Sequence, residues 1–241
     1  MTPPAAPARS PRQQADPTHD PGRWTDHGLF LVFEGGDGVG KTTQVRAVLA
    51  WLAAAGIDAV STFEPGDTAV GRRIRNLVLD PATGDVDARA EALLYAADKA
   101  QHLFGVVEPA LARGSVVVCD RYVDSMLAYQ GAGRALSLSE VEGIARWATG
   151  DLRPDLTVLL DLGPELAVAR LRNKDRLEGA GVEFHQRARA FFLDLAAADP
   201  DHYLVLPARL PRHEISAAIQ DRVKPLLVAR GLSAGAGTMP T

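Results

Sequence analysis

The sequence predicts an α/β fold in which helices cover both faces of a parallel sheet. Five short apolar runs alternate along the chain with longer segments of helical pattern. Continuous apolar runs of this length are typical of strands that are buried on both faces. Parallel strands joined through helices need right-handed crossovers, which place helices on both sides of the sheet. We therefore expect a three-layer, doubly wound sandwich.

The elements follow one another from residue 29 onward. In chain order, the expected strands are Leu29–Phe33, Ala59–Phe63, Val116–Cys119, Leu156–Leu160 and Tyr203–Leu206. The expected helices are Lys41–Ala55, Thr68–Leu79, Ala88–Arg113, Ser139–Thr149, Pro164–Asn173, Val182–Ala198 and Pro211–Ala229. Ser139 and Glu142 have the spacing of a capping box, which predicts a helix start at that point.

Both ends of the chain are predicted to be disordered tails, at 1–28 and 231–241. Between Met1 and His27 the only large apolar residue is Trp24, and prolines are frequent. Such a segment buries too little surface to offset the entropy of ordering it. We expect residues 29–230 to form one folded domain, and removal of residues 1–27 to leave the melting temperature unchanged.

Composition excludes several classes of protein. The 241 residues carry a net charge of −4, so no basic field favours binding to nucleic acid or to an anionic membrane. The longest apolar run, Ala47–Ile57, is well short of the roughly 20 residues that span a bilayer. The single cysteine, Cys119, excludes an intrachain disulfide and a cysteine-based zinc site, and it fits a reducing compartment.

A phosphate-binding motif lies between the first strand and the first helix. Residues 35–42 match the pattern G-x-x-x-x-G-K-[ST], whose backbone N–H groups surround phosphate oxygens. Lys41 would reach the β- and γ-phosphates of ATP, and the Thr42 hydroxyl would ligate Mg²⁺. The predicted ATP-binding residues of the loop are Gly35, Gly36, Asp37, Gly38, Val39, Gly40, Lys41, Thr42 and Thr43. The alternative is a glycine-rich turn without a ligand.

Asp120 follows the third apolar run directly. Ligands of parallel sheets bind beyond the carboxyl ends of the strands, so Asp120 is predicted to face the Mg²⁺ site together with Thr42. The alternative reading is that Asp120 caps the following helix.

Several further motifs together resemble the thymidylate kinase family, in its bacterial type with a basic lid. They are Glu34-Gly35-Gly36-Asp37-Gly38, Glu64-Pro65-Gly66, Asp120-Arg121-Tyr122, Ala128–Arg134, Arg153–Thr157 and Asp175–Glu178. The resemblance covers about Leu29 to Leu227. It implies a nucleoside-monophosphate-kinase-like fold with five parallel strands, and ATP- and Mg²⁺-dependent phosphorylation of dTMP to dTDP. It also implies a cytoplasmic location and a homodimer.

The resemblance also implies roles for individual residues. Asp37 would hold the sugar 3′-hydroxyl, Tyr129 would contact the deoxyribose, and Arg121 would clamp the acceptor phosphate. The full predicted acceptor site is Asp37, Glu64, Arg75, Tyr95, Lys99, Arg121, Ser125, Tyr129 and Gln130. Tyr95 would stack on the base. The predicted catalytic residues are Lys41, Asp120, Arg121 and Arg176.

A basic segment at about 172–182 is predicted to be a lid over ATP. It contains Arg172, Lys174 and Arg176 beside two glycines. Because Gly38 and Val39 follow Asp37, the phosphate loop has no arginine to neutralise charge in the transition state. Arg176 of the lid is therefore predicted to supply the missing charge. Arg172 of the lid is predicted to bind ATP. The alternative is a solvated charged turn.

Three residues depart from the family pattern near the base. Phe63 and Lys99 stand where the family commonly has arginine, and Met126 stands where it has a small or polar residue. Lys99 is predicted to donate to a carbonyl of thymine, which favours dTMP over dCMP. Two rivals stay open, a kinase for a modified pyrimidine monophosphate and a nucleotide-binding regulatory protein without catalysis. His102 is predicted to lie on a helix surface, and the alternative is that it approaches the base beside Tyr95 and Lys99. Trp147 is predicted to lie in the core or in a dimer interface.

Overall fold

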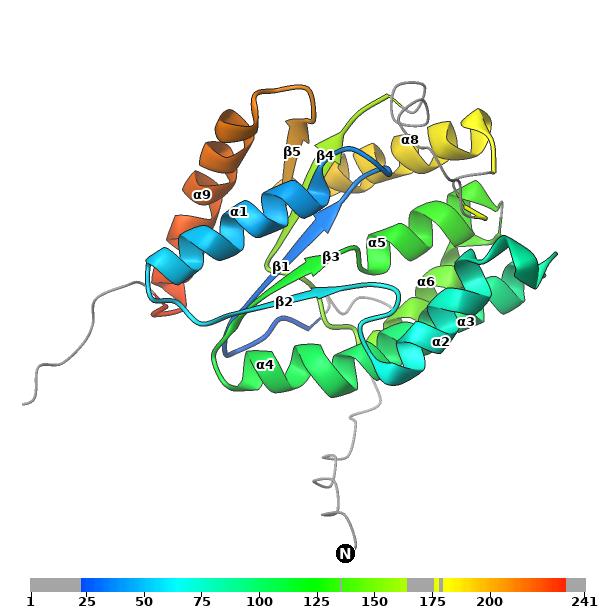
Figure 1. Cartoon of the computed structure of the whole chain (residues 1–241), viewed down its shortest axis with the longest axis horizontal. Helices are drawn as coiled ribbons and strands as arrows, with labels where there is room; N and C mark the ends of the chain where they lie inside the picture. The colour runs from blue at the N-terminus through cyan, green and yellow to red at the C-terminus, as the bar shows by residue number, and fades with distance from the viewer. Residues whose placement is uncertain (1–22, 135, 164–175, 178–179, 233–241) are drawn as a thin grey trace, which may run out of the picture.

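The structure is a computed structural model that describes residues 23–134, 136–163, 176–177 and 180–232 (Figure 1). The helix predicted at Pro164–Asn173, the ends of the chain and most of the predicted lid lie outside these residues. The described residues include all five predicted strands, the phosphate-binding motif at 35–42 and the predicted acceptor-site residues.

Five parallel strands form one sheet in the order β2-β3-β1-β4-β5. Their bounds are β1 Leu29–Glu34, β2 Ala59–Phe63, β3 Val116–Asp120, β4 Leu156–Asp161 and β5 Tyr203–Pro207. Each begins where the sequence predicts, and all except β2 continue one residue beyond the apolar run. The backbone ladder thus carries Glu34 and Asp120 to the edge of the sheet where ligands bind.

Helices connect the strands. They are α1 Lys41–Ala54, α2 Ala69–Leu79, α3 Ala88–His102, α4 Glu108–Ala112, α5 Val123–Met126, α6 Leu138–Thr149, α8 Val182–Ala198 and α9 Arg212–Ala229. The single helix predicted at 88–113 is continuous but has a π-helical turn at Leu103–Val107 between α3 and α4. A second π-helical segment, Leu127–Gly133, extends α5 and was not predicted.

The helices form two layers on either side of the sheet (Figure 1). Residues alternate in direction along β1. Leu29, Leu31 and Phe33 pack in the core under α1 and α9. Phe30 and Val32 point to the opposite core, which α4 shares. Because each fully buried side chain of this size contributes about 1.5–3 kcal/mol, β1 anchors both layers.

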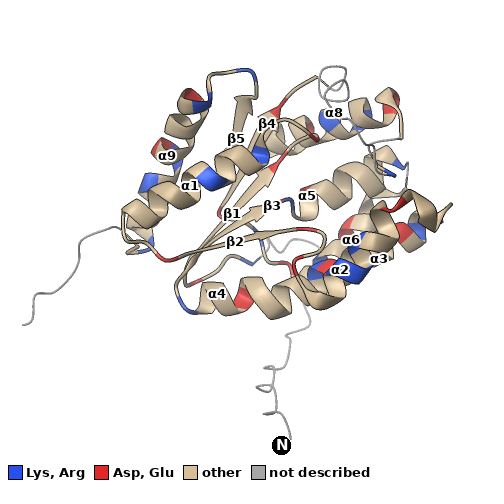
Figure 2. Ribbon diagram, in the orientation of Figure 1, with Lys and Arg blue, Asp and Glu red and all other residues tan. Residues whose placement is uncertain are grey.

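Charged side chains lie mainly on the helices and at the strand ends, and the middle of the sheet is apolar (Figure 2). Acidic and basic residues also meet in the loops beyond β2 and β3. Within the described residues, no helix is both long and apolar enough to cross a bilayer.

Residues 23–28 form a strap along the amino ends of the strands, which we call the N-terminal strap. The Arg23 N–H donates to Asp151 O at 2.8 Å, and Arg153 N–H donates to Arg23 O at 2.7 Å. The Trp24 ring stacks on His202 with 5.2 Å between centroids. The tail boundary predicted at residue 28 therefore differs from the structure, because one aromatic side chain and backbone pairing are enough to dock this stretch.

Candidate active site

The loop between β1 and α1 is shaped for a phosphate group. Gly35 has a φ of 123°, and a Cβ at this position would lie 2.3 Å from the Leu160 carbonyl oxygen, so only glycine fits. Gly40 precedes α1 with a φ of 103°. No side chain caps α1 and its first turn has no acidic residue. The helix thus presents its backbone N–H groups and positive dipole end to an anion.

Lys41 folds over this loop. Its Nζ donates to Gly35 O at 3.0 Å and to Gly36 O at 2.8 Å. Burial, with the positive charge of Arg121, lowers the pKa of Lys41 to about 8, against the opposing effect of Asp120, Asp37 and Glu34. A bound polyphosphate would restore the charged form, because it places negative charge beside the ammonium group.

Thr42 and Asp120 meet where a magnesium ion is expected. The Thr42 hydroxyl donates to Asp120 Oδ2 at 3.3 Å. The described residues contain no group of three or more acidic, histidine or cysteine side chains that could hold a metal. Two hard oxygen ligands suit Mg²⁺, which usually completes its shell with phosphate oxygens and water. Asp120 does not cap α5, whose N-cap residue is Tyr122.

Arg121 gathers the predicted acceptor residues. Its guanidinium donates to Asp37 Oδ1, to Ser125 Oγ at 3.0 Å and to Tyr129 Oη at 3.4 Å. It also lies over the Tyr129 ring, 5.3 Å from the centroid. Burial acts to raise the pKa of Asp37, but Arg121 and Lys41 outweigh it and hold that pKa below its usual value. Asp37 is thus an anion that can accept a hydrogen bond from a hydroxyl.

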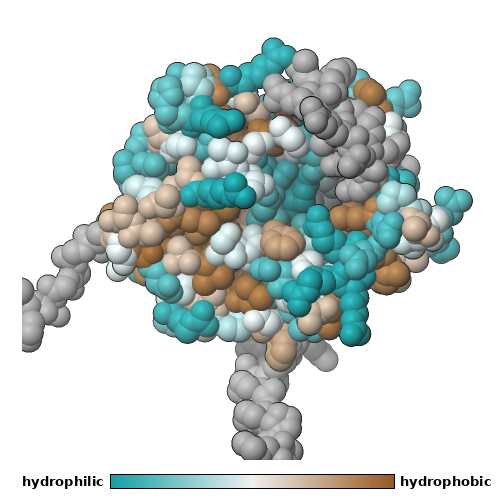
Figure 3. Space-filling model, in the orientation of Figure 1, coloured by the Kyte–Doolittle hydropathy of each residue, from teal (hydrophilic) through white to brown (hydrophobic). Residues whose placement is uncertain are grey.

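Two pockets meet at this point. The first, a cleft of about 550 Å³, is lined by the phosphate loop, Thr42 and Asp120. The second, about 80 Å³, includes Tyr95, Met126, Tyr129 and Gln130 in its wall. The residues that line both are Asp37, Glu64, Arg75 and Arg121. Figure 3 shows hydrophilic side chains in a hollow between α1 and α5. We call these the phosphate-loop cleft and the acceptor pocket.

The acceptor pocket is smaller than the roughly 300–1,000 Å³ of typical ligand pockets. Leu177 also lines it, and this residue belongs to the segment predicted as a lid. A nucleotide must therefore displace side chains to enter.

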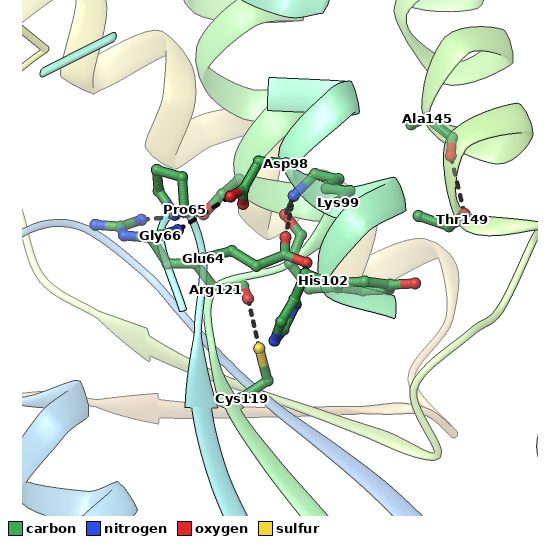
Figure 4. A network of polar contacts seen from close by, with 12 residues as sticks. Glu64, Pro65, Gly66, Asp98, Lys99, His102, Cys119, Arg121, Ala145 and Thr149 are labelled. Carbon is green, nitrogen blue, oxygen red and sulfur yellow. Dashed lines mark hydrogen bonds and ion pairs between the residues drawn. The ribbon is translucent and has the colours of Figure 1, made fainter. Parts of the chain in front are cut away.

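A buried ionic cluster supports the loop that follows β2 (Figure 4). Lys99 Nζ pairs with Glu64 Oε2 and donates to Tyr122 O at 2.7 Å. His102 Nδ1 lies 2.7 Å from Glu64 Oε1, and its Nε2 lies 2.5 Å from Thr62 Oγ1. Burial favours a higher pKa for Glu64, but Lys99 and His102 lower it. The prediction that His102 lies on a surface is wrong, because its side chain is 1% exposed and paired with Glu64.

The ionic cluster also changes the view of Lys99. The sequence predicts that Lys99 donates to a base carbonyl, and the side chain does line the acceptor pocket. Two of its donors nevertheless serve Glu64 and Tyr122. Phe63 stands where arginine is expected from the family resemblance. The Arg75 guanidinium lies over the Phe63 ring, 5.8 Å from its centroid. Arg75 also donates to Pro65 O at 2.7 Å, so α2 and α3 hold this loop together.

Glu91 is a hub that sequence reasoning missed. It is fully buried and accepts from Gln130 Nε2 at 3.1 Å, from Arg134 and, at 3.3 Å, from Arg176. Arg176 also donates to Val78 O at 3.0 Å. The structure therefore places Arg176 beside α3. Arg176 is not among the described residues that line the phosphate-loop cleft. Arg172 lies outside the described residues. The one available signal was spacing, because Glu91 precedes Tyr95 by one helical turn.

A model of the thymidylate kinase family matches residues 33–219, which contain the phosphate loop and both pockets. The chain belongs to the thymidylate kinase family. This membership confirms the resemblance, the predicted fold class and the prediction of a nucleoside monophosphate kinase.

Curated thymidylate kinases are similar over most of their length. One from Cutibacterium acnes is 61% identical, covering 83% of this chain and 98% of the relative. One from Bifidobacterium longum (strain NCC 2705) is 50% identical, covering 83% of this chain and 99% of the relative. One from Deinococcus radiodurans is 51% identical, covering 80% of this chain and 94% of the relative.

Proposed function

We propose that this member of the thymidylate kinase family transfers the γ-phosphoryl group of ATP to dTMP and so forms dTDP and ADP. The observation that carries the proposal is the wall of Asp37, Glu64, Arg75 and Arg121 that the phosphate-loop cleft and the acceptor pocket share. Groups bound on the two sides of this wall meet at Arg121. An oxygen of the dTMP phosphate attacks the γ-phosphorus, and the bond to the bridging oxygen of ADP breaks.

The protein's part in this transfer is positioning and charge. Lys41 and the N-terminus of α1 hold the β- and γ-phosphates. Thr42 and Asp120 would hold Mg²⁺, which would supply positive charge beside the transferred phosphoryl group. Arg121 grips the acceptor phosphate through its planar fork. Asp37 accepts from the sugar 3′-hydroxyl, and Tyr129 and Tyr95 contact the sugar and the base. Glu64, Arg75, Lys99, Ser125 and Gln130 complete the acceptor site.

Arg176 is proposed to neutralise charge between the two nucleotides. In the structure its guanidinium is held by Glu91 and Val78 O, so it must leave these partners to do so. Arg176→Ala should then lower kcat more than it raises the KM for dTMP. A rise in the KM for dTMP alone would place Arg176 in the acceptor site instead.

A coupled assay that follows ADP release tests the function. ATP should be consumed with dTMP, and kcat/KM for dTMP should exceed that for dCMP by at least roughly tenfold. The reason is that Lys99 is proposed to donate to a thymine carbonyl, and a buried donor left unpaired by cytosine costs about 1–3 kcal/mol. dUMP, 5-substituted dUMP and 3′-deoxy-dTMP complete the panel. Turnover of a modified pyrimidine in preference to dTMP would contradict the proposal, as would ATP binding without turnover.

We also propose a homodimer. Leu93 and Trp147 are exposed on α3 and α6, and with Leu136, Val141 and Ile144 they line an apolar groove of about 520 Å³. Trp147 is 75% exposed, so the prediction that it lies in the core is wrong, and its exposure supports the proposed interface. A cytoplasmic location and the absence of nucleic-acid and membrane partners stay predictions, and the free, buried Cys119 fits a reducing compartment.

A further inference from the structure

The backbone at Arg121 needs support. Its φ is 73°, in the left-handed region that residues other than glycine rarely adopt. Such a conformation persists only where the surrounding structure determines it. The Arg121 N–H donates to Phe33 O at 2.9 Å, which fixes one side of the residue. The next peptide N–H, that of Tyr122, is held by Glu34.

Glu34 is the last residue of β1 and has no exposed surface. Its Oε1 accepts from Tyr122 N–H at 2.8 Å and from Ser125 N–H at 3.1 Å. Its Oε2 accepts from the Ser125 hydroxyl at 2.6 Å. One carboxylate therefore fixes the first turn of α5 at two points, directly after Arg121.

The direction of these hydrogen bonds orients the guanidinium. The Ser125 hydroxyl has a single hydrogen, which it donates in the hydrogen bond to the carboxylate of Glu34. The oxygen lone pairs of Ser125 then face Arg121 Nη1, which donates to them at 3.0 Å. The other end of the guanidinium pairs with Asp37. A chain of hydrogen bonds thus runs from Glu34 through Ser125 and Arg121 to the wall of the two pockets.

We propose that Glu34 is a positioning residue that sets the backbone and the guanidinium of Arg121 for the acceptor phosphate. The proposal rests on the proposed function of Arg121. Glu34 cannot touch a nucleotide, because its side chain is completely covered. It acts through two routes, the backbone N–H groups of α5 and the acceptor polarity of the Ser125 hydroxyl.

Glu34→Gln tests the proposal because it preserves shape and replaces one accepting oxygen with a donating amide group. The glutamine amide group would donate to Ser125 Oγ, so the Ser125 hydroxyl could no longer donate its hydrogen to residue 34. That hydrogen would have to point elsewhere, which disturbs the hydrogen bond from Arg121 to Ser125 Oγ. We expect the KM for dTMP to rise roughly tenfold to hundredfold, the range for a lost charged hydrogen bond. The KM for ATP should stay within about twofold, because the phosphate loop and Lys41 are unchanged. An unchanged KM for dTMP, or an equal rise in both KM values, would overturn the proposal.

Asp155→Asn is the matched control. Asp155 is also buried and accepts from a backbone N–H of β1, that of Phe30, at 2.7 Å, but at the other end of the strand. It should lower the melting temperature and leave the KM for dTMP unchanged. If Glu34→Gln behaves in the same way, Glu34 has only a structural role.

Ser125→Ala separates the two routes and serves if Glu34→Gln does not fold. It removes the hydroxyl and keeps the backbone bonds to Glu34, so the KM for dTMP should rise. The combined variant should show less than the product of the two single effects, since both break one chain. Independent, multiplicative effects would refute the chain. Wild-type turnover on the monophosphate panel is measured first. If another monophosphate is the acceptor, the proposed function fails, and the variants are compared with that acceptor.

Discussion

At the scale of single residues, burial and neighbouring charges together set the pKa values of the groups in the candidate site. Lys41 is nearly covered, and its pKa falls to about 8 because its ammonium group is poorly solvated. Asp37 keeps a low pKa because Arg121 and Lys41 outweigh its burial. The two groups that meet phosphate and sugar in the proposed reaction are thus prepared by their neighbours before any nucleotide binds.

Lys41→Ala should therefore remove most of the activity. The lysine charge is needed most when the γ-phosphoryl group leaves, and loss of one such donor costs about 10²–10³ in kcat in other enzymes. The change is measured as kcat at saturating ATP and dTMP. Lys224→Ala is the control, because Lys224 is an exposed residue of α9 that pairs with Asp221. Turnover close to wild type in Lys41→Ala would show that the loop does not hold the transferred phosphate.

Asp98 should make the stability depend on pH. Burial and the charge of Glu64 raise the pKa of Asp98 to about 6, from 3.8. A carboxyl with a raised folded-state pKa stabilises the fold while it is protonated, and this contribution is lost as pH rises from about 4 to about 6. Relative to wild type, Asp98→Asn should gain roughly 3 kcal/mol in the free energy of unfolding between pH 4 and 7. Urea denaturation of both proteins at several pH values measures it, and a constant difference would contradict the raised pKa.

At the scale of elements, the sequence predicted all five strands, and burial on both faces explains the apolar runs of β1, β3 and β4. The edge strands β2 and β5 are only partly buried, and β2 includes Ser61 and Thr62. The strand ends were less accurate, since the backbone ladder extends one residue into polar sequence at Glu34 and Asp120. The phosphate-loop motif could be recognised in the sequence because its glycines and its lysine lie within residues 35–42. The ionic cluster around Glu64 was not predicted. Glu64 lies in the loop after β2, whereas Lys99 and His102 lie on α3, and helical periodicity does not show which carboxylate a helix will face.

The N-terminal strap should stabilise the body. Trp24 stacks on His202 and lines a cavity beside α6 and α8. Trp24→Ala should cost roughly 1–2 kcal/mol, which corresponds to about 3–6 °C in a domain of this size. This replaces the expectation that removal of residues 1–27 is neutral. Thermal melts measure the effect.

Trp24→Phe is the control for that substitution. The buried indole N–H has no hydrogen-bond partner in the described part of the chain, so phenylalanine should retain most of the stability. Both variants should keep wild-type kcat/KM, because the strap lies at the amino ends of the strands, away from the phosphate loop. An unchanged melting temperature in Trp24→Ala would show that the strap is not needed for stability.

At the scale of the whole molecule, one side carries the chemistry and another carries an unpartnered apolar surface. The loops after β1, β2 and β3 form the phosphate-loop cleft and the acceptor pocket. The apolar groove lies on α3 and α6, and α3 also supplies Lys99, His102 and Glu91 to the interior. A second copy of the chain on this groove would therefore press on a helix that supports the acceptor pocket.

Trp147→Glu should convert a dimer to a monomer. A buried carboxylate without a partner opposes association at the proposed interface. Sedimentation velocity at micromolar concentration measures the change. Val228→Glu is the control, because Val228 is also an exposed hydrophobic residue, 65% exposed, and lies on α9. A variant that sediments like wild type would place the interface elsewhere, and a monomeric wild type would refute the dimer itself.

The wall between the two pockets also limits how the enzyme can evolve. In the proposed reaction, a substitution at Asp37 or Arg121 alters the binding of donor and acceptor together, because both residues line both pockets. A lineage that adapts there to a new base would therefore lose turnover at the same step. Tyr95 and Met126 line the acceptor pocket alone and carry no such penalty. Base preference should therefore drift first at those positions. An inhibitor that spans the wall would, for the same reason, leave few single substitutions by which resistance arises in a still active kinase.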